Sequence, residues 1–137
     1  MATKATVVNA DNTASSTTIM QFNPTSQLPI KLAGNHNFRT WKAQVSMLMH
    51  EPNLFGHLDG TIAAPPTTLT ENNEFTPNLA YTNWFHQDQL VQNAILASVE
   101  PTLVSTVAID KTANKAWESL HTFFANKSHT RIISLQD

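Results

Sequence analysis

The stretch that most constrains the fold is 79–99, LAYTNWFHQDQLVQNAILASV, which contains neither glycine nor proline. One stripe at spacings of three and four carries apolar and small side chains: Tyr81, Trp84, Val91, Ala94, Ile95 and Ser98. The opposite stripe is polar: Thr82, His86, Gln89 and Asn93. This periodicity predicts a long amphipathic helix with a wide apolar face. We expect Thr76 to cap it, with Pro77 in its first turn, and Glu100-Pro101 to end it.

Two further stretches have the same helical spacing. The upstream stripe, in a helix expected over about 38–50, is Phe38, Trp41, Val45, Leu48 and Met49. The downstream stripe, in a helix expected over about 113–126, is Ala113, Ala116, Trp117, Leu120 and Phe124. Each of the three stripes carries one tryptophan, and we expect the three helices to bury these rings against one another. The sequence therefore predicts an all-α fold, a small bundle of four to five short helices.

The remaining segments predict connections. Residues 1–27 are rich in Ser, Thr and Asn and predict a disordered tail. Leu28, Ile30 and Leu32 alternate with other residues and predict one extended segment before the first helix, with Asn35 or Asn37 capping that helix. Residues 53–60 predict a half-helical piece and 62–78 an extended, exposed loop. The sequence thus divides into a tail, 1–27, and a helical domain, 28–137.

The end of the chain predicts two more helical pieces and an interruption. Pro101 favours a short helix over about 101–107, and Asp110 or Thr112 can cap the helix after it. Asn126-Lys127-Ser128 predicts a break, after which a last helical segment would be incomplete at Asp137. We therefore expect the helical domain to be truncated at its C-terminal end.

Charge and cysteine content exclude several classes of protein. The chain has 8 basic and 10 acidic residues, a formal net charge of −2, whereas dedicated nucleic-acid binders carry a large basic excess. It has no cysteine, which excludes disulfides, thiol nucleophiles and zinc knuckles. No apolar run has the length of a membrane span and no secretory signal is visible. We expect an intracellular, cytoplasmic protein that is not secreted and has no membrane partner.

No motif predicts catalysis, a cofactor, a metal or a small-molecule substrate. Gly34, Gly56 and Gly60 lie too far apart for a phosphate-binding loop. The histidine pairs His50/His57 and His121/His129 lack the spacing of zinc sites. We therefore expect a protein that is not an enzyme.

The three tryptophans and Asp88 are the notable side chains. Trp41, Trp84 and Trp117 could form a base-stacking platform, but their position on apolar stripes favours core packing. Asp88 lies inside the apolar stripe, and a buried carboxylate needs a partner. We expect a structural role for Asp88, holding a neighbouring element through charge-assisted hydrogen bonds with Arg39, Lys42 or Arg131.

The C-terminal end is mildly basic. Its cations are Lys111, Lys115, Lys127 and Arg131. They could contact RNA phosphates weakly. The interpretation we favour is a solvated surface, because Asp110 and Glu118 flank them.

Four groups of residues in order resemble one known family. They are Leu32, Gly34, Asn37, Phe38 and Trp41; then Leu58, Asp59 and Gly60 followed by a proline pair; then Tyr81, Trp84 and Asp88; and then Ala113, Trp117, Leu120, Phe124, Ser128, Arg131, Ile132 and Leu135. Their order and spacing resemble the N-terminal region of the Gag polyprotein of copia-type LTR retrotransposons of plants, running into its capsid-like domain. The resemblance covers about residues 28–137.

The resemblance implies a noncatalytic structural protein that self-associates in particle assembly around element RNA. Its partners would be further copies of itself or other Gag chains, with RNA as a weak additional partner. The family's Cys-Cys-His-Cys knuckle and its protease motif Asp-Thr/Ser-Gly are absent from this sequence. Alternatives are a weak nucleic-acid-binding module or an inactive retrotransposon remnant. Candidate assembly residues are Phe85, Leu90 and Leu96, which flank the main stripe of the central helix.

Overall fold

The computed structural model describes residues 18–106 and 112–136; the side chains of Thr106 and of residues 125–136 lie outside that description. It divides into two compact units: Met1–Met20 with Ala64–Gln87, and Gln21–Ala63 with Asp88–Asp137. We call them the hairpin unit and the helical unit. Within the described part, no helix has the length and apolar character needed to cross a membrane.

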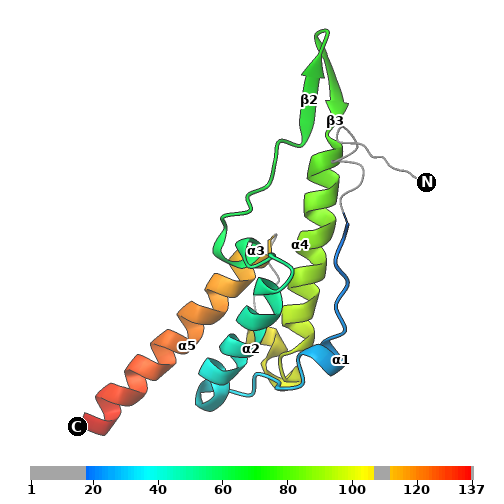
Figure 1. Cartoon of the computed structure of the whole chain (residues 1–137). Helices are drawn as coiled ribbons and strands as arrows, with labels where there is room; N and C mark the ends of the chain where they lie inside the picture. The colour runs from blue at the N-terminus through cyan, green and yellow to red at the C-terminus, as the bar shows by residue number, and fades with distance from the viewer. Residues whose placement is uncertain (1–17, 107–111, 137) are drawn as a thin grey trace. The chain divides into compact units, whose positions relative to one another are not determined.

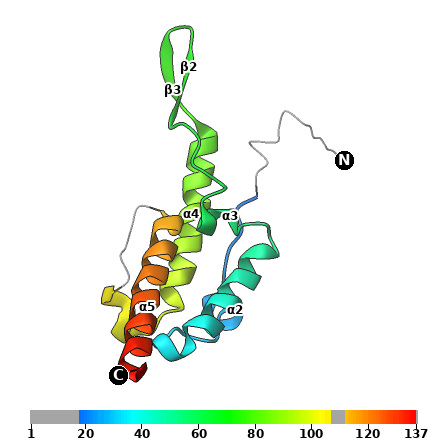
Figure 2. The same ribbon diagram turned by 90° about the vertical axis from the view of Figure 1, so that its left-hand side faces the viewer.

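The elements follow one another in this order (Figures 1 and 2): α1 Pro24–Gln27, η2 Asn35–Asn37, α2 Phe38–His50, α3 Gly56–Asp59, β2 Thr68–Glu71, β3 Glu74–Pro77, α4 Leu79–Ala97, η3 Pro101–Thr106 and α5 Ala113–Gln136. The fold is mostly helical, as predicted. It also contains a small two-stranded sheet, so the all-α prediction is only partly correct.

The core lies in the helical unit, between α2, the second half of α4 and α5 (Figure 2). Its members come from the predicted stripes and from two flanking segments: Leu28, Leu32, Trp41, Val45, Met49, Leu58, Val91, Ala94, Ile95, Val99, Ala113, Trp117, Leu120 and Phe124. Helix α2 has the predicted bounds, 38–50. The apolar period of 3.6 therefore predicted correctly the bounds of α2 and the buried faces of α2, of the second half of α4 and of the start of α5.

Helix α4 begins later than predicted. Its N-terminal partner is Asn78, whose side-chain Oδ1 accepts the backbone N–H of Ala80 at 3.1 Å. Thr76 and Pro77, the predicted cap and first turn, belong to strand β3 instead. Asparagine is as good a cap as threonine, and the strand pairing of Thr76 with Leu69 decides between them.

The extended segment before α2 is held at several points. The Leu32 N–H donates to Ser98 O at 2.8 Å and the Glu100 N–H donates to Leu32 O at 2.9 Å, a single parallel bridge beside Val99. Leu28 and Leu32 are fully buried, as expected, but Ile30 is 40% exposed and does not share their face. The Ile30 backbone is instead held by two hydrogen bonds to the side-chain amide of Gln44.

The segment before Leu28 corrects another prediction. Two ordered features lie inside the stretch that the sequence predicted as disordered. They are the helical turn α1 and the hydrogen bonds between the Met20 backbone and the Gln87 side chain. The Met20 N–H donates to Gln87 Oε1 at 2.7 Å, and Gln87 Nε2 donates to Met20 O at 3.1 Å. The Gln87 side-chain amide thus bonds both backbone groups of Met20, a contact that composition does not reveal. Residues 1–17 lie outside the described part.

The hairpin corrects the prediction of a loop over 62–78. Strands β2 and β3 pair antiparallel with Thr68 opposite Pro77 and Glu71 opposite Glu74. The turn residues Asn72 and Asn73 have φ of 52° and 65°. Two successive left-handed residues form the tight turn that matches the twist of paired strands, and asparagine tolerates that conformation better than most residues. The turn therefore determines that the segments on either side of it pair as strands. Their sequence is too polar to predict strands by itself.

Helix α5 is longer than predicted. Thr112 caps it, as one predicted alternative had it, with its Oγ1 accepting the Lys115 N–H at 3.2 Å. The helix then continues to Gln136, through the predicted break at Asn126-Lys127-Ser128. Asn and Ser are weak helix formers but, unlike Gly and Pro, cost well under 1 kcal/mol each, so a long helix carries them through.

Candidate functional site

Asp88 is the centre of a buried polar cluster in the helical unit. Its Oδ1 lies 2.9 Å from His57 Nδ1, and its Oδ2 accepts the Ala113 N–H at 2.9 Å. Asp88 is 0% exposed and His57 is 4% exposed. Because a carboxylate only accepts hydrogen bonds, His57 carries the proton on Nδ1. The Ala113 N–H is one of the free donors of a helix start, so the carboxylate also acts as a cap for α5.

The structural role predicted for Asp88 fits this geometry, but two of its predicted cationic partners, Arg39 and Lys42, are wrong. The two partners are His57 and the Ala113 backbone, not Arg39 or Lys42, both of which are exposed on α2. The Arg131 side chain lies outside the described part. Sequence reasoning missed His57 as a partner because it lies in a short segment without clear periodicity; the signal available was its place between the inward-pointing Phe55 and Leu58.

Two amides extend the cluster. Asn114 Nδ2 donates to Leu58 O at 2.6 Å, and Gln92 Nε2 donates to Thr112 O at 3.0 Å. Together with Asp88 they tie α3 and the start of α5 to the second half of α4. With both ionisable members almost fully buried, this arrangement suits a structural connection rather than proton exchange with a substrate.

The tryptophans divide between the two units. Trp41 is fully buried, its Nε1 donates to Ser98 Oγ at 2.9 Å, and its ring lies 5.7 Å from that of Trp117. Trp84 belongs to the hairpin unit, where it is half-buried and stacks on Tyr81 at 6.1 Å. The core prediction is therefore confirmed for Trp41 and Trp117, which pack together in the helical unit.

The other residues of the family resemblance shape turns and the core. Asn37 Nδ2 donates to Lys31 O at 2.8 Å, and its Oδ1 accepts the N–H groups of Ala33 and Gly34. Asp59 Oδ1 accepts from the Thr61 N–H and hydroxyl at 2.9 and 2.7 Å, and these bonds hold the pKa of the Asp59 carboxyl below its usual value. The remaining described members are Leu32, Leu58, Leu120 and Phe124, all buried, and Phe38 and Tyr81, both half-buried.

Two glycines are required by the backbone beside Asp59. Gly60 has φ of 88°, in the left-handed region that ends α3. A Cβ on Gly56 would collide with the side chain of Ile62. The predicted turn at Asp59-Gly60 is confirmed, and the resemblance residues Asp59 and Gly60 have a conformational role.

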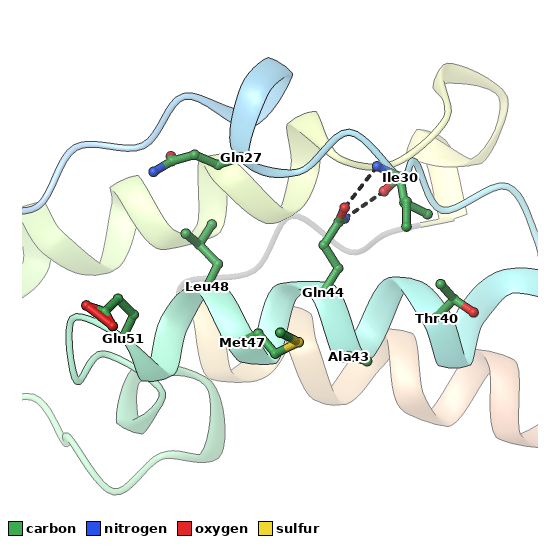
Figure 3. A pocket seen from close by; sticks show the side chains of 8 residues that line it. All are labelled: Gln27, Ile30, Thr40, Ala43, Gln44, Met47, Leu48 and Glu51. Carbon is green, nitrogen blue, oxygen red and sulfur yellow. Dashed lines mark hydrogen bonds between the residues drawn. The ribbon is translucent and has the colours of Figure 1, made fainter.

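An apolar groove lies on the surface of the helical unit, between the segment around Ile30 and helix α2 (Figure 3). Its volume is about 590 Å³, and it is lined by Gln27, Ile30, Thr40, Ala43, Gln44, Met47, Leu48 and Glu51. Met47 is 72% exposed and Ile30 is 40% exposed. Gln44 holds the two sides together: its Oε1 accepts the Ile30 N–H at 3.0 Å and its Nε2 donates to Ile30 O at 2.9 Å. We call this the Met47 groove; sequence reasoning missed it.

A second, more polar hollow of about 450 Å³ lies where α3 meets α5. His121 lines it, with Nδ1 2.8 Å from Trp117 O and its ring 5.1 Å from that of Phe38. Burial lowers the pKa of the His121 imidazole, since it disfavours the charged form, and Lys42 acts in the same direction.

The residues predicted for weak RNA contact are described only in part. Lys115 is exposed on α5. The side chains of Lys111, Lys127 and Arg131 lie outside the described part. Over the described ranges, no three His, Asp or Glu side chains gather where they could hold a metal ion.

Comparison with known proteins finds two plant relatives. The chain is 32% identical over 100 residues to the retrovirus-related Pol polyprotein from transposon RE1 of Arabidopsis thaliana, and 33% identical over 100 residues to that from transposon RE2. Each match covers 73% of this chain and 7% of the relative. No family model and no solved structure matches the chain. The chain is therefore related to plant retrotransposon polyproteins, which confirms that part of the predicted resemblance.

Proposed function

We propose, from this relation, that the chain is the Gag-like part of a copia-type retrotransposon polyprotein: a noncatalytic structural protein that self-associates in particle assembly. The relatives are polyproteins, and the chain spans only 7% of their length, a segment related to one part of a larger whole. The Gag assignment draws on the order of the resemblance motifs. The observation that carries self-association is the Met47 groove.

The Met47 groove has the features of a protein-binding surface. A methionine that is 72% exposed gains free energy when a partner removes it from water, and contiguous exposed apolar surface marks interaction sites. Met47 lies on the face of α2 opposite the buried Trp41, Val45 and Met49, so packing of the chain's own core does not account for its apolar character. A second copy of the chain is the occupant we propose.

Further apolar side chains are available for such contacts. In the hairpin unit, Leu69 is 46%, Phe75 77%, Leu79 53% and Phe85 42% exposed. Of the assembly residues predicted from sequence, Phe85 thus remains a candidate and Leu90 is half-buried. Leu96 packs against the core of the helical unit, which makes it a poor candidate.

The test is the solution mass of the full 137-residue chain, measured by light scattering over a concentration series. We expect the mass to rise beyond that of a monomer as concentration increases. Met47→Asp should shift this rise to concentrations about tenfold higher, because a charge on an apolar contact opposes its burial. Asn93→Asp, also exposed on a helix of the same unit, is the matched control and should behave as the wild type.

A wild-type chain that stays monomeric at every concentration would contradict self-association by this chain and favour the alternative of an inactive remnant. The alternative of weak RNA binding through Lys111, Lys115, Lys127 and Arg131 makes a different prediction. It requires RNA affinity that falls steeply between about 50 and 200 mM salt.

A further inference from the structure

The hairpin is an almost entirely exposed element. Seven of its eight strand residues are exposed, and Phe75 is 77% exposed. Its shape is nevertheless well specified, because Asn72 and Asn73 supply the left-handed turn that two paired strands require. A short two-stranded hairpin is marginally stable by itself. This one therefore stands to gain stability from a partner that covers one of its faces.

The tip of the hairpin carries two carboxylates side by side. Glu71 lies directly opposite Glu74 in the strand pairing, next to the turn. Side chains paired in this way have Cβ atoms about 5 Å apart, and like charges in this arrangement destabilise the pair. No Lys or Arg occurs within residues 64–87, so this part of the hairpin unit has no cation to offset them.

Helix α2 in the helical unit carries a matching pair of cations. Arg39 and Lys42 are both exposed and are three residues apart, which places them on the same side of the helix with Cβ atoms about 5–6 Å apart. Among the residues that the structure describes, the ion pair present is His57–Asp88, and it uses neither cation. The Cβ separation typical of such a helix pair is close to that typical of such a strand pair, about 5 Å in each case.

We infer that the Glu71–Glu74 face of the hairpin in one copy binds the Arg39–Lys42 face of α2 in a second copy. This inference rests on the proposed self-association and adds a second contact between copies to the one proposed at the Met47 groove. The charges are complementary, and their spacing allows both pairs to form at once. Leu69 lies on the same hairpin face as Glu71 and Glu74, by strand alternation, and is 46% exposed, so it adds apolar area to the contact.

The contact joins two different surfaces, so each copy offers one of each. Where two copies make this contact reciprocally they form a closed pair, and where they do not, it builds rings or open chains of copies. Exposed ion pairs are individually weak and sensitive to salt, but they decide which surfaces meet. A growing assembly multiplies the weak contact, because each copy is held at two points.

The test is a charge exchange in the full-length chain, read by light scattering over a concentration series at low salt. Glu71→Lys/Glu74→Lys and Arg39→Glu/Lys42→Glu should each raise the concentration at which mass grows by at least about tenfold, because each turns two attractions into repulsions. An equimolar mixture of the two variants should assemble as the wild type does, because each reversed face then meets an opposite charge. The substituted side chains are all exposed, and circular dichroism should show unchanged helix content.

A matched control separates the specific contact from net charge. Glu100→Lys/Glu118→Lys changes the net charge by the same amount on the helical unit and should leave assembly as in the wild type. Assembly of the wild type together with unchanged assembly of Glu71→Lys/Glu74→Lys would overturn this inference and leave the proposed self-association intact. Failure of the mixture to assemble would also overturn it. A wild-type chain that stays monomeric overturns both.

Discussion

At the scale of single residues, the buried polar side chains specify the arrangement of the core more narrowly than the apolar side chains do. Asp88 accepts from an imidazole and from the first backbone N–H of α5, and so connects three helices. Ser98 accepts the Trp41 indole N–H and donates to Ile95 O at 2.7 Å. Buried polar groups that are fully paired specify one arrangement of a core, since any shift leaves one of them unsatisfied.

Replacing Asp88 by Asn tests that role. An amide keeps one acceptor oxygen but replaces the other with a donor, which faces either the His57 proton or the Ala113 N–H. We expect Asp88→Asn to lower the free energy of unfolding by about 1–3 kcal/mol, measured by urea denaturation at pH 7. An unchanged melting temperature would contradict the structural role. Asn93→Asp, at an exposed position on α4, serves as the control for an amide–carboxylate exchange and should cost less.

His121 predicts a pH dependence with a definite sign. Its pKa in the folded protein lies below the ordinary histidine value of 6.5, so the unfolded chain binds the proton more readily. Stability should therefore fall as the pH is lowered through 6.5 toward the folded-state pKa. In His121→Gln this part of the slope should disappear, which thermal melts between pH 7.5 and 5 would measure. A steeper slope in the variant than in the wild type would show that the sign is wrong.

At the scale of elements, the helices follow from the sequence pattern, whereas the extended segments depend on contacts from elsewhere. The segment from Leu28 to Leu32 has no strand partner along its length. It is fixed by a bridge at Val99 and by the two bonds of the Gln44 amide to Ile30. One side wall of the Met47 groove therefore depends on a single side chain of α2.

Removing the Gln44 amide should loosen that wall. We expect Gln44→Ala to cost about 1–2 kcal/mol of unfolding free energy, because it leaves the Ile30 N–H and C=O without their partner. Amide exchange at Ile30 should accelerate while that of α2 remains unchanged, as NMR would show. Thr40→Ala, at the groove edge on the same helix, is the control. Equal protection of Ile30 in both variants would show that the amide pairing is dispensable.

At the scale of the whole molecule, the two units differ in the interactions that stabilise them. The helical unit contains all fourteen members of the core cluster. The described part of the hairpin unit has its strand residues in water, with Asn78 buried beneath the strands, its Nδ2 donating to Pro66 O at 2.7 Å. Burial of apolar area supplies most of folding stability, so the two units should differ in resistance to local opening.

Hydrogen exchange should reveal this difference directly. We expect the amides of β2 and β3 to exchange at least about tenfold faster than those of Val45, Met49, Ala94 and Ile95, which lie in the core of the helical unit. The measurement is exchange followed by NMR or mass spectrometry at a concentration where the chain is monomeric. If the proposed contact forms, hairpin protection should rise with concentration. Equal protection of strands and core helices in the monomer would contradict the two-unit description.

The sequence by itself determined where the three long helices lie and which faces of α2, of the second half of α4 and of the first half of α5 are buried, because a period of 3.6 places apolar side chains on one side of a helix. It also indicated that Asp88 is buried, and that Thr112 and Asp59-Gly60 begin and end elements, because capping and left-handed turns depend on residues close in the chain. The order of the motifs in the sequence likewise indicated the similarity to retrotransposon polyproteins.

Only the tertiary structure decided the partners. His57 meets Asp88 across 31 positions, Ser98 meets Trp41 across 57 and Gln87 meets Met20 across 67, and no local pattern encodes such pairings. The hairpin, the assignment of Trp84 to a second unit and the Met47 groove were missed for the same reason. Strand pairing and grooves form between segments distant in sequence, and their free energy exists only once the chain has brought those segments together.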